Sequence, residues 1–247
     1  MELKGKNVLV TGGAKRVGRA IVKRLVSKGA RVFIHYHTSE PEARELVGQI
    51  REQGGIAECF QADLATTEGV QSLVEAIHQT GASIDVLVNN ASVFFPTPLA
   101  ELDATTWDRV LAVNLRAPFL LCRHFGQAMV EQQRGKIINI ADTAVHRPYR
   151  NYAAYLVSKA GLAALTSVLA LEFAPHVQVN TIAPGTVLFA ENFPETVRSA
   201  IVRRTPLQRI GSPEDIAAAV EYLIVSGDFI TGAFLPVDGG SALGFPT

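Results

Sequence analysis

The stretch "NVLVTGGAKRVG", residues 7–18, decides the fold class of this chain. The apolar run "NVLV" is typical of a buried strand, and Gly12, Gly13 and Gly18 allow a tight turn into a helix. Such a helix offers free backbone N–H groups to a pyrophosphate. The spacing is neither G-x-G-x-x-G nor G-x-x-x-G-x-G, so a merely tight strand-to-helix turn remains the alternative. Arg16 stands where a glycine would be expected.

The rest of the chain repeats this alternation of short apolar runs and helical patterns. Strands are predicted at 7–12, 31–37, 56–63, 84–91, 135–142, 177–185 and 233–240. Helices are predicted at 16–28, 40–53, 67–80, 103–115, 117–133, 152–174 and 213–225. The fourth and fifth are separated around Pro118, and 186–210 is a long irregular segment. The pattern predicts one α/β domain over 1–247: a Rossmann-type, doubly wound parallel sheet of about seven strands with helices on both faces.

Composition argues against several classes of partner. The 247 residues include 23 basic and 23 acidic side chains with no basic block, which disfavours nucleic acid and anionic membranes. Cys59 and Cys122 are far apart and form no CxxC pattern, so neither a metal site nor a disulfide framework is expected. There is no signal-peptide pattern and no charge-free apolar run of about 18 residues. We therefore expect a cytoplasmic protein.

The end of the second predicted strand, "HYHTSE" (35–40), bears on the cofactor. An NAD enzyme usually places Asp or Glu there to bind the ribose hydroxyl, whereas a 2′-phosphate favours donors and cations. The chain supplies His37, Thr38, Ser39, Lys15 and Arg16. These favour NADP(H). Glu40 opposes this interpretation, but the proline after it indicates the start of a helix, and His35 is interpreted as a packed strand residue.

A candidate proton donor lies in "YLVSK", where Tyr155 and Lys159 share one face of a predicted helix. An ammonium beside a phenol should lower the pKa of the phenol and make it a usable general acid. An ordinary surface Tyr and Lys is the alternative for the pair alone. Other motifs in the chain support the catalytic interpretation of the pair: the glycine turn, "NNA" after the fourth strand, Asn114 in "AVNL" and "PG" after the sixth strand.

Together these motifs resemble the short-chain dehydrogenase/reductase family over nearly the whole chain. The resemblance implies that Asn114, Tyr155 and Lys159 belong to a catalytic tetrad. Asn114 would support a water-linked proton path, Lys159 would also bind the nicotinamide ribose, and Asp63 would reach the adenine. The other implied cofactor contacts are Gly12, Val17, Leu64, Asn90, Ala91, Pro184 and Gly185. The family also implies a homotetramer formed through two long helices and the last strand.

The fourth tetrad position departs from the family. A serine usually stands thirteen residues before the tyrosine, but here that residue is Asp142, in "NIADTAV". A serine donates to a carbonyl oxygen as it becomes an alkoxide, whereas an ionised aspartate would repel that oxygen. Either Asp142 is protonated, or the substrate is not a simple ketone. A C=N bond fits better, because its nitrogen gains a proton and a carboxylate suits a cationic heterocycle.

A narrower resemblance accounts for these departures. "TGGAKRVG", "HYHTS", "NNASVFFPTPL" and the Asp/Tyr/Lys spacing are similar to the pteridine reductases and bacterial dihydromonapterin reductases. In that case Arg16 would lie between cofactor phosphate and pterin, because a guanidinium suits both partners. Ser92 would contact phosphate or pterin. Thr38 differs from the arginine that the parasite enzymes have before the serine, which weakens the case for NADPH.

The same resemblance implies further substrate contacts. Phe94 would stack on the pterin, while Phe95 packs in the core. Asp142 and Tyr155 would anchor the amino group and ring nitrogens of the pterin and relay protons. Residues 186–205 would form a lid, and Leu188 would either close over the ligand or pack against the domain.

These expectations favour an NADPH-dependent reductase that converts dihydropterins to tetrahydropterins. One alternative is a carbonyl or 3-oxoacyl reductase, against which Asp142 and the lack of a basic patch for an acidic carrier argue. Another is an NADP(H)-binding sensor without turnover. The intact set of Asn114, Tyr155 and Lys159 argues against the sensor.

Overall fold

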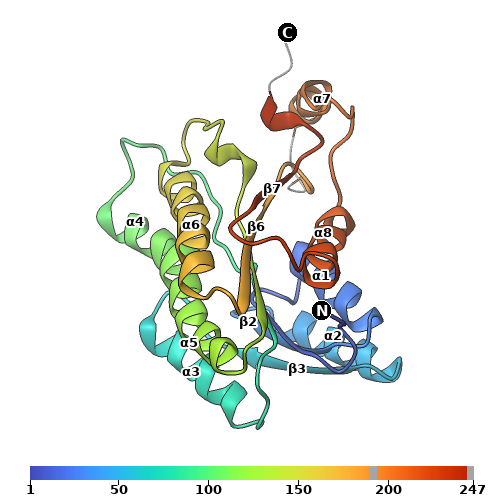
Figure 1. Cartoon of the computed structure of the whole chain (residues 1–247). Coiled ribbons are helices and arrows are strands. Elements are labelled where there is room, and N and C mark those ends of the chain that lie inside the picture. The colour runs from blue at the N-terminus through green and yellow to red at the C-terminus, as the bar shows by residue number, and fades with distance from the viewer. Residues whose placement is uncertain (190–193, 244–247) are drawn as a thin grey trace.

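A parallel sheet of seven strands forms the centre of the computed structural model, which describes residues 1–189 and 194–243 (Figure 1). The strands are β1 (Asn7–Val10), β2 (Arg31–Tyr36), β3 (Ile56–Gln61), β4 (Val86–Asn89), β5 (Gly135–Ile140), β6 (Val177–Pro184) and β7 (Phe234–Val237). Their order in the sheet is β3-β2-β1-β4-β5-β6-β7. The strand order reverses beside β1, between β1 and β4, and a sheet of this kind binds its ligands at such a point. The predicted doubly wound sheet is confirmed.

Helices cover both faces of the sheet (Figure 1). One face carries α1 (Arg16–Ser27), α2 (Glu40–Glu52) and α8 (Pro213–Val225). The opposite face carries α3 (Thr67–His78), α5 (Ala117–Glu131) and α6 (Ala153–Glu172). Two hydrophobic cores result, one on each side of the strands.

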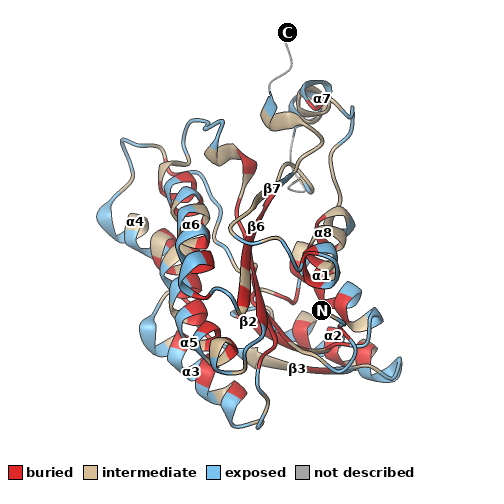
Figure 2. Cartoon of the chain, viewed as in Figure 1, coloured by how far each residue is buried: buried red, intermediate tan, exposed pale blue. Residues whose placement is uncertain are grey.

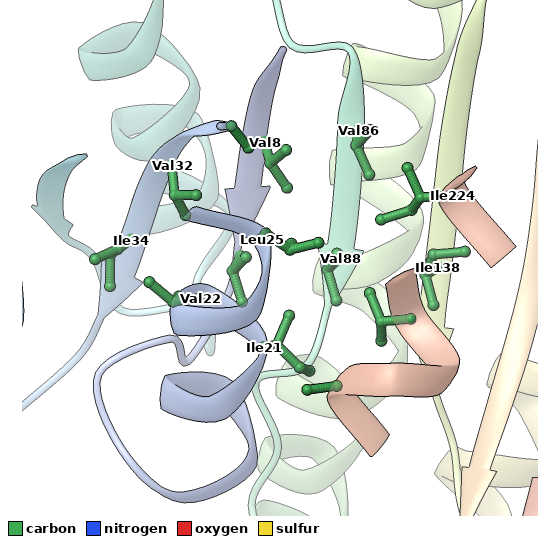
Figure 3. Packing of buried hydrophobic residues seen from close by; sticks show 14 of the residues in the cluster. Val8, Ile21, Val22, Leu25, Val32, Ile34, Val86, Val88, Ile138 and Ile224 are labelled. Carbon is green, nitrogen blue, oxygen red and sulfur yellow. The ribbon is translucent and has the colours of Figure 1, made fainter. Parts of the chain in front are cut away.

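Successive side chains along each strand point to opposite faces of the sheet, so each strand contributes to both cores. Val8 and Val10 are fully buried toward α1 and α8, whereas Leu9 is fully buried in the other core. Figure 2 shows this burial along the central strands, and Figure 3 shows the first core at close range. Each fully buried aliphatic side chain contributes roughly 1.5–3 kcal/mol. The glycine turn after β1 is therefore held on a rigid strand.

The predicted break around Pro118 is wrong. Helix α4 (Ala104–Leu111) continues through a π-helical turn (Ala112–Arg116) directly into α5. Proline is tolerated in the first turn of a helix, where the ladder does not need its missing N–H, and Pro118 occupies that place in α5. The π-helical turn before Pro118 is wider than an α-helical turn, and it allows α4 to continue into α5.

The predicted irregular segment at 186–210 is also wrong in part. It contains α7 (Glu195–Arg204), a helix with no buried side chain. The sequence there has apolar residues at helical spacing only over Val197, Ala200 and Ile201, between a glutamate at one end and two arginines at the other. This pattern was too short to predict the helix.

One helix, α6, is long and apolar enough by length and composition to cross a membrane. In this fold, half of that stretch is buried inside the protein. Leu169 and Ala170 pack into the core formed with α3 and α5. The apolar character of α6 is thus explained by its position against the sheet, where it carries Tyr155 and Lys159.

Candidate active site

The turn after β1 requires glycine at two positions. Gly12 has φ +60°, and a Cβ there would lie 2.9 Å from the Cα of Ala91. A Cβ on Gly18 would fall on the carbonyl oxygen of Gly12. Helix α1 then begins beside Lys15, which makes no side-chain cap. This combination of close-packed backbone and a helix start without a side-chain cap fits the pyrophosphate of a dinucleotide.

Arg16 adopts the backbone conformation of the glycine that it replaces. Its φ is +51°, in the left-handed region. For a residue with a Cβ this costs roughly 1–2 kcal/mol. Strain of this kind gathers at functional sites. The side chain is exposed at the start of α1, so the turn presents a guanidinium where the phosphate is expected.

The loop after β2 presents three donors to the same edge of the sheet. His37 and Thr38 are exposed. Ser39 precedes α2, and its hydroxyl makes no cap bond to that helix. These groups are suited to the oxygens of a ribose phosphate, as the sequence predicts for NADP(H).

The charged residues near this loop are already paired. Glu40 lies in the first turn of α2 and pairs with Arg44 at 2.7 Å, so this carboxylate is turned toward its own helix. Lys15 pairs with Glu42 at 2.6 Å. Glu40 therefore does not oppose the NADP(H) interpretation, because its carboxylate is paired within α2. The charge of Lys15 is partly neutralised by Glu42 of the same helix.

The residues after β4 are tied to the glycine turn. The Thr11 hydroxyl accepts hydrogen bonds from the backbone N–H groups of Asn90 and Ala91, both at 3.0 Å. The Asn90 amide donates to the carbonyl oxygen of Gly12 at 3.0 Å. These bonds bring the expected cofactor residues Gly12, Asn90 and Ala91 together.

Three other expected cofactor residues lie around this edge. The carboxylate of Asp63 accepts from the N–H of Ala65 at 2.9 Å and is half exposed. Leu64 is buried in the core, which leaves only its backbone for a ligand, and Val17 packs partly against the other core. Of these three, Asp63 alone offers a side-chain contact.

Asp142, Tyr155 and Lys159 meet at the carboxyl end of β5. The Tyr155 hydroxyl donates to Asp142 at 2.7 Å. The second carboxylate oxygen of Asp142 accepts from the N–H of Ala144 at 2.8 Å. Lys159 is buried, donates to the carbonyl oxygen of Ile140 at 2.8 Å and lies 5.8 Å from the centre of the Tyr155 ring. The sequence spacing correctly predicts that these three side chains gather.

The expected lowering of the Tyr155 pKa is wrong for the protein without ligand. Burial raises the pKa of Tyr155 well above its ordinary value, and the Asp142 carboxylate raises it further. Burial also raises the pKa of Asp142, and it lowers the pKa of Lys159 to about 8. The phenol therefore holds its proton and donates it toward Asp142, because the carboxylate is nearer than the ammonium.

Asn114 lies in the π-helical turn and is fully buried. Its amide oxygen accepts from the N–H of Val93 at 2.9 Å and from the Ser92 hydroxyl at 3.2 Å. Its amide nitrogen donates to Ser158 at 3.1 Å, in the helix that carries Tyr155. The side chain thus ties the loop of Ser92 to α6, and the proton-path role of Asn114 stays a prediction.

Phe94 stands beside Tyr155, the expected proton donor. Its ring stacks on Tyr152 with centroids 4.7 Å apart and meets Tyr155 edge-on at 4.8 Å. It is 55% exposed, so one face is open to a ligand, whereas Phe95 is 38% exposed and not packed in the core as expected. Tyr149 packs against Tyr152 in turn. Tyr149 and Tyr152 were not among the residues expected at the site, although the aromatic spacing in "YRNYAAY" (149–155) was a usable signal.

The carboxyl end of β6 completes the site. The Thr143 hydroxyl donates to the carbonyl oxygen of Pro184 at 3.2 Å, and Gly185 donates to Val237 at 3.0 Å. Leu188 is 36% exposed in the following loop. Within the expected lid, residues 190–193 lie outside the described residues, and the part after them is α7. The guanidinium of Arg198 on α7 lies 5.3 Å from the Phe189 ring centre.

Comparison with known proteins places this site in a family. The model of the short chain dehydrogenase family matches residues 6–198. The chain belongs to this family. The matched residues include the glycine turn, Tyr155 and Lys159, as well as Asp142, which departs from the pattern described above.

Individual members of the short-chain dehydrogenase family share most of the chain's length. The 3beta-hydroxysteroid dehydrogenase 1 of Eggerthella lenta is 38% identical over 98% of this chain and 95% of its own length. The glucose 1-dehydrogenase 2 of Bacillus subtilis is 32% identical over 98% and 96%. The crystal structure of FolM alternative dihydrofolate reductase 1 from Brucella canis, complexed with NADP, has a TM-score of 0.92 at 36% identity and covers 100% of this chain and 97% of that one.

Proposed function

We propose that this short-chain dehydrogenase reduces the C=N bond of dihydropterins, giving tetrahydropterins with NADPH as the reductant. The observation that carries the proposal is the partly buried Asp142 carboxylate, 2.7 Å from the Tyr155 hydroxyl, where a serine donor is usual. The likeness to the FolM structures, at 36% identity, supports the same substrate class.

The cofactor is NADP(H), which, when bound, supplies the hydride. The close-packed glycine turn and the uncapped start of α1 are suited to its pyrophosphate. His37, Thr38 and Ser39 would hold the 2′-phosphate, and Asp63 would face the adenine. Lys159, together with Pro184 and Gly185, would position the nicotinamide end.

The residues of the site suit the reduction of a C=N bond. The ring nitrogen would take a proton from Tyr155 first, which makes the C=N bond cationic, and Asp142 would stabilise that positive charge. The carbon then takes the hydride, and the π electrons become the lone pair of a neutral amine. With a ketone, the same electrons would form an alkoxide. At about 4 Å and an effective dielectric constant of about 20, a carboxylate repels such an oxygen by roughly 4 kcal/mol.

The pterin would lie against the open face of Phe94. Arg16 would hydrogen-bond in the plane of the ring while contacting cofactor phosphate. Ser92 would contact the cofactor phosphate or the ring from the loop that Asn114 fixes. Leu188 would close the site from the side of β6.

A second candidate is an oxidoreductase of carbonyl or hydroxyl groups. The observation that favours it is the 38% identity to a hydroxysteroid dehydrogenase over nearly the full length of both chains. If Asp142 is protonated in the complex, its O–H could donate to a carbonyl oxygen as serine does. This candidate predicts turnover of alcohols or ketones rather than pterins.

The assembly proposed for the protein is a cytoplasmic homotetramer. Large apolar side chains are exposed on α5, on α6, on α8 and after α8: Phe119, Val168, Leu171, Tyr222 and Phe229. The free cysteines Cys59 and Cys122 suit a reducing compartment. Light scattering during size-exclusion chromatography tests the assembly: four times 26.6 kDa is expected, and a monomer contradicts it.

The function is tested by a substrate panel with the purified protein. NADPH oxidation is measured with dihydrobiopterin, dihydromonapterin, dihydrofolate and an acetoacetyl thioester, and NADP reduction with a 3β-hydroxysteroid and glucose. Turnover of dihydropterins, lost in Tyr155→Phe, supports the proposal. Turnover of only the thioester, steroid or sugar supports the second candidate. Cofactor binding without turnover of any of them would favour a sensor.

A further inference from the structure

His35 on β2 is a buried histidine that lies outside the catalytic group, with only 2% of its surface exposed. Its Nδ1 accepts a hydrogen bond from the backbone N–H of Gly12 at 3.1 Å. Its Nε2 lies 3.1 Å from the carbonyl oxygen of Ala62. A carbonyl can only accept and an N–H can only donate, so the ring is neutral and carries its proton on Nε2.

The two partners of His35 belong to two different loops at the ligand edge. Gly12 lies in the turn after β1, and Ala62 directly precedes Asp63 in the loop after β3. The backbone of His35 adds a third bond, since its carbonyl oxygen accepts from Gly13 at 3.0 Å. One residue thus sets the spacing between the pyrophosphate turn and the adenine loop.

The bond to His35 holds one side of the Thr11–Gly12 peptide, whose carbonyl oxygen is held on the other side by the Asn90 amide at 2.9 Å. The N–H of Gly12 is held by the ring of His35, and its carbonyl oxygen is held by the amide of Asn90 at 3.0 Å. Its φ of +60° is a conformation from which glycine escapes easily. Without the imidazole acceptor, this N–H must rotate toward water or stay unpaired.

We propose that His35 is a positioning residue for NADP(H): its neutral imidazole holds the Gly12 turn and the Ala62–Asp63 loop in the arrangement that the dinucleotide binds. This role concerns the cofactor site alone and does not depend on the pterin substrate. A turn that relaxes in the free protein must be reordered when the cofactor binds, so the loss appears in cofactor affinity. The reacting groups around Tyr155 are untouched.

Two substitutions separate the two bonds of the ring. In His35→Asn the amide oxygen takes the place of Nδ1, so it can accept from Gly12 but cannot reach Ala62. In His35→Gln the longer amide reaches Ala62 but leaves Gly12 without an acceptor. Both variants remove the imidazole, and His35→Asn loses more packing than His35→Gln because its side chain is one methylene shorter.

The experiment measures the NADPH dissociation constant by calorimetry, with thermal stability and steady-state rates alongside. We expect His35→Gln to raise the dissociation constant and the KM for NADPH roughly tenfold or more, the usual effect of an unpaired buried donor. His35→Asn should stay within about threefold of the wild type. For both, kcat at saturating NADPH should be unchanged. His78→Asn, at an exposed histidine on α3, is the control and should leave all values unchanged.

A packing role alone would lower the melting temperature of His35→Asn more than that of His35→Gln and leave the NADPH dissociation constant unchanged. That result, or an equal rise in both dissociation constants, overturns the proposal. If either variant does not fold, the ¹⁵N spectrum of histidine-labelled wild type decides. An Nε2–H tautomer with Nδ1 unprotonated, both with and without NADPH, supports the proposal. A ring protonated at Nδ1 overturns it.

Discussion

Replacing Asp142 by asparagine should lower the pKa of Tyr155 sharply. The two side-chain oxygens are 2.7 Å apart, so the phenolate forms beside a negative charge in the wild type. At an effective dielectric constant of about 20, two unit charges about 3 Å apart repel by roughly 5 kcal/mol, or about 4 pKa units. That figure is an upper bound. We expect a fall of at least about 2 units in Asp142→Asn.

The geometry favours this variant over a truncation. The introduced asparagine can keep the bond from the N–H of Ala144 through its side-chain oxygen. Its amide nitrogen then faces the phenol oxygen and donates to it, which favours the phenolate further. The fall in pKa therefore reports the charge of Asp142 and not a collapse of the site.

The assay is the ¹³C resonance of the tyrosine ζ carbons between pH 7 and 11. The chain has five tyrosines, so Tyr155→Phe assigns the signal of interest. In the wild type this signal should stay at its neutral position throughout, because the pKa is well above the ordinary value. In Asp142→Asn it should move toward its phenolate position at a lower pH than in the wild type. Asp103→Asn, at another carboxylate that caps a helix, is the matched control and should leave the signal unmoved.

A Tyr155 signal that stays neutral up to pH 11 in folded Asp142→Asn would refute this reasoning. Burial alone would then hold the phenol in its neutral form. The charge of Asp142 would then not explain why Tyr155 holds its proton in a site that reduces a C=N bond.

Three further predictions concern the cofactor edge. Arg16→Gly should leave the free energy of unfolding within about 1 kcal/mol of the wild type, because relief of the left-handed strain offsets the greater freedom of glycine in the unfolded chain. It should weaken NADPH binding at least about tenfold. Urea unfolding measures the stability, calorimetry measures the binding, and Arg16→Lys is the control. Thr38→Asp should reduce the preference for NADPH over NADH by about tenfold or more, measured as the ratio of kcat/KM values; an unchanged ratio would remove the loop after β2 from the phosphate site. Burial lowers the pKa of His35 from 6.5 to about 4, outweighing the opposing effects of the hydrogen bond to Ala62 and of Asp63. The stabilisation by neutral His35 is therefore present above pH 6.5, and about 3 kcal/mol of it is lost as the pH falls through 4. Urea unfolding should show this acid-side loss in the wild type and its absence in His35→Asn.

The sequence was sufficient to predict the sheet, because short apolar runs alternate with helical patterns along the chain. The same patterns did not predict α7, whose apolar spacing is short and which has no buried side chain. They also misplaced a break at Pro118, because proline is compatible with the first turn of a helix and only the structure shows the π-helical turn before it.

The candidate site, like the fold, was predicted from the sequence only in part. Helical spacing paired Tyr155 with Lys159, and the family resemblance added Asp142; the structure places the three side chains together. The sequence could not predict which neighbour has the larger effect on the pKa of the Tyr155 phenol, because that depends on distances. The Tyr155 hydroxyl lies 2.7 Å from Asp142, whereas the Lys159 ammonium lies 5.8 Å from the centre of the Tyr155 ring. The contacts of His35 were likewise hidden, because its partners are backbone groups that no side-chain pattern reveals.

The central claim is that Asp142 commits the site to C=N bonds. The most direct test compares kcat/KM for dihydrobiopterin with that for an acetoacetyl thioester in the wild type and in Asp142→Ser. The wild type should favour the dihydropterin by at least about 100-fold, and Asp142→Ser should move the ratio toward the thioester by a similar factor, consistent with roughly 3 kcal/mol of carboxylate repulsion. A wild type that reduces the thioester as efficiently as the dihydropterin, or a ratio that Asp142→Ser does not change, would contradict the account.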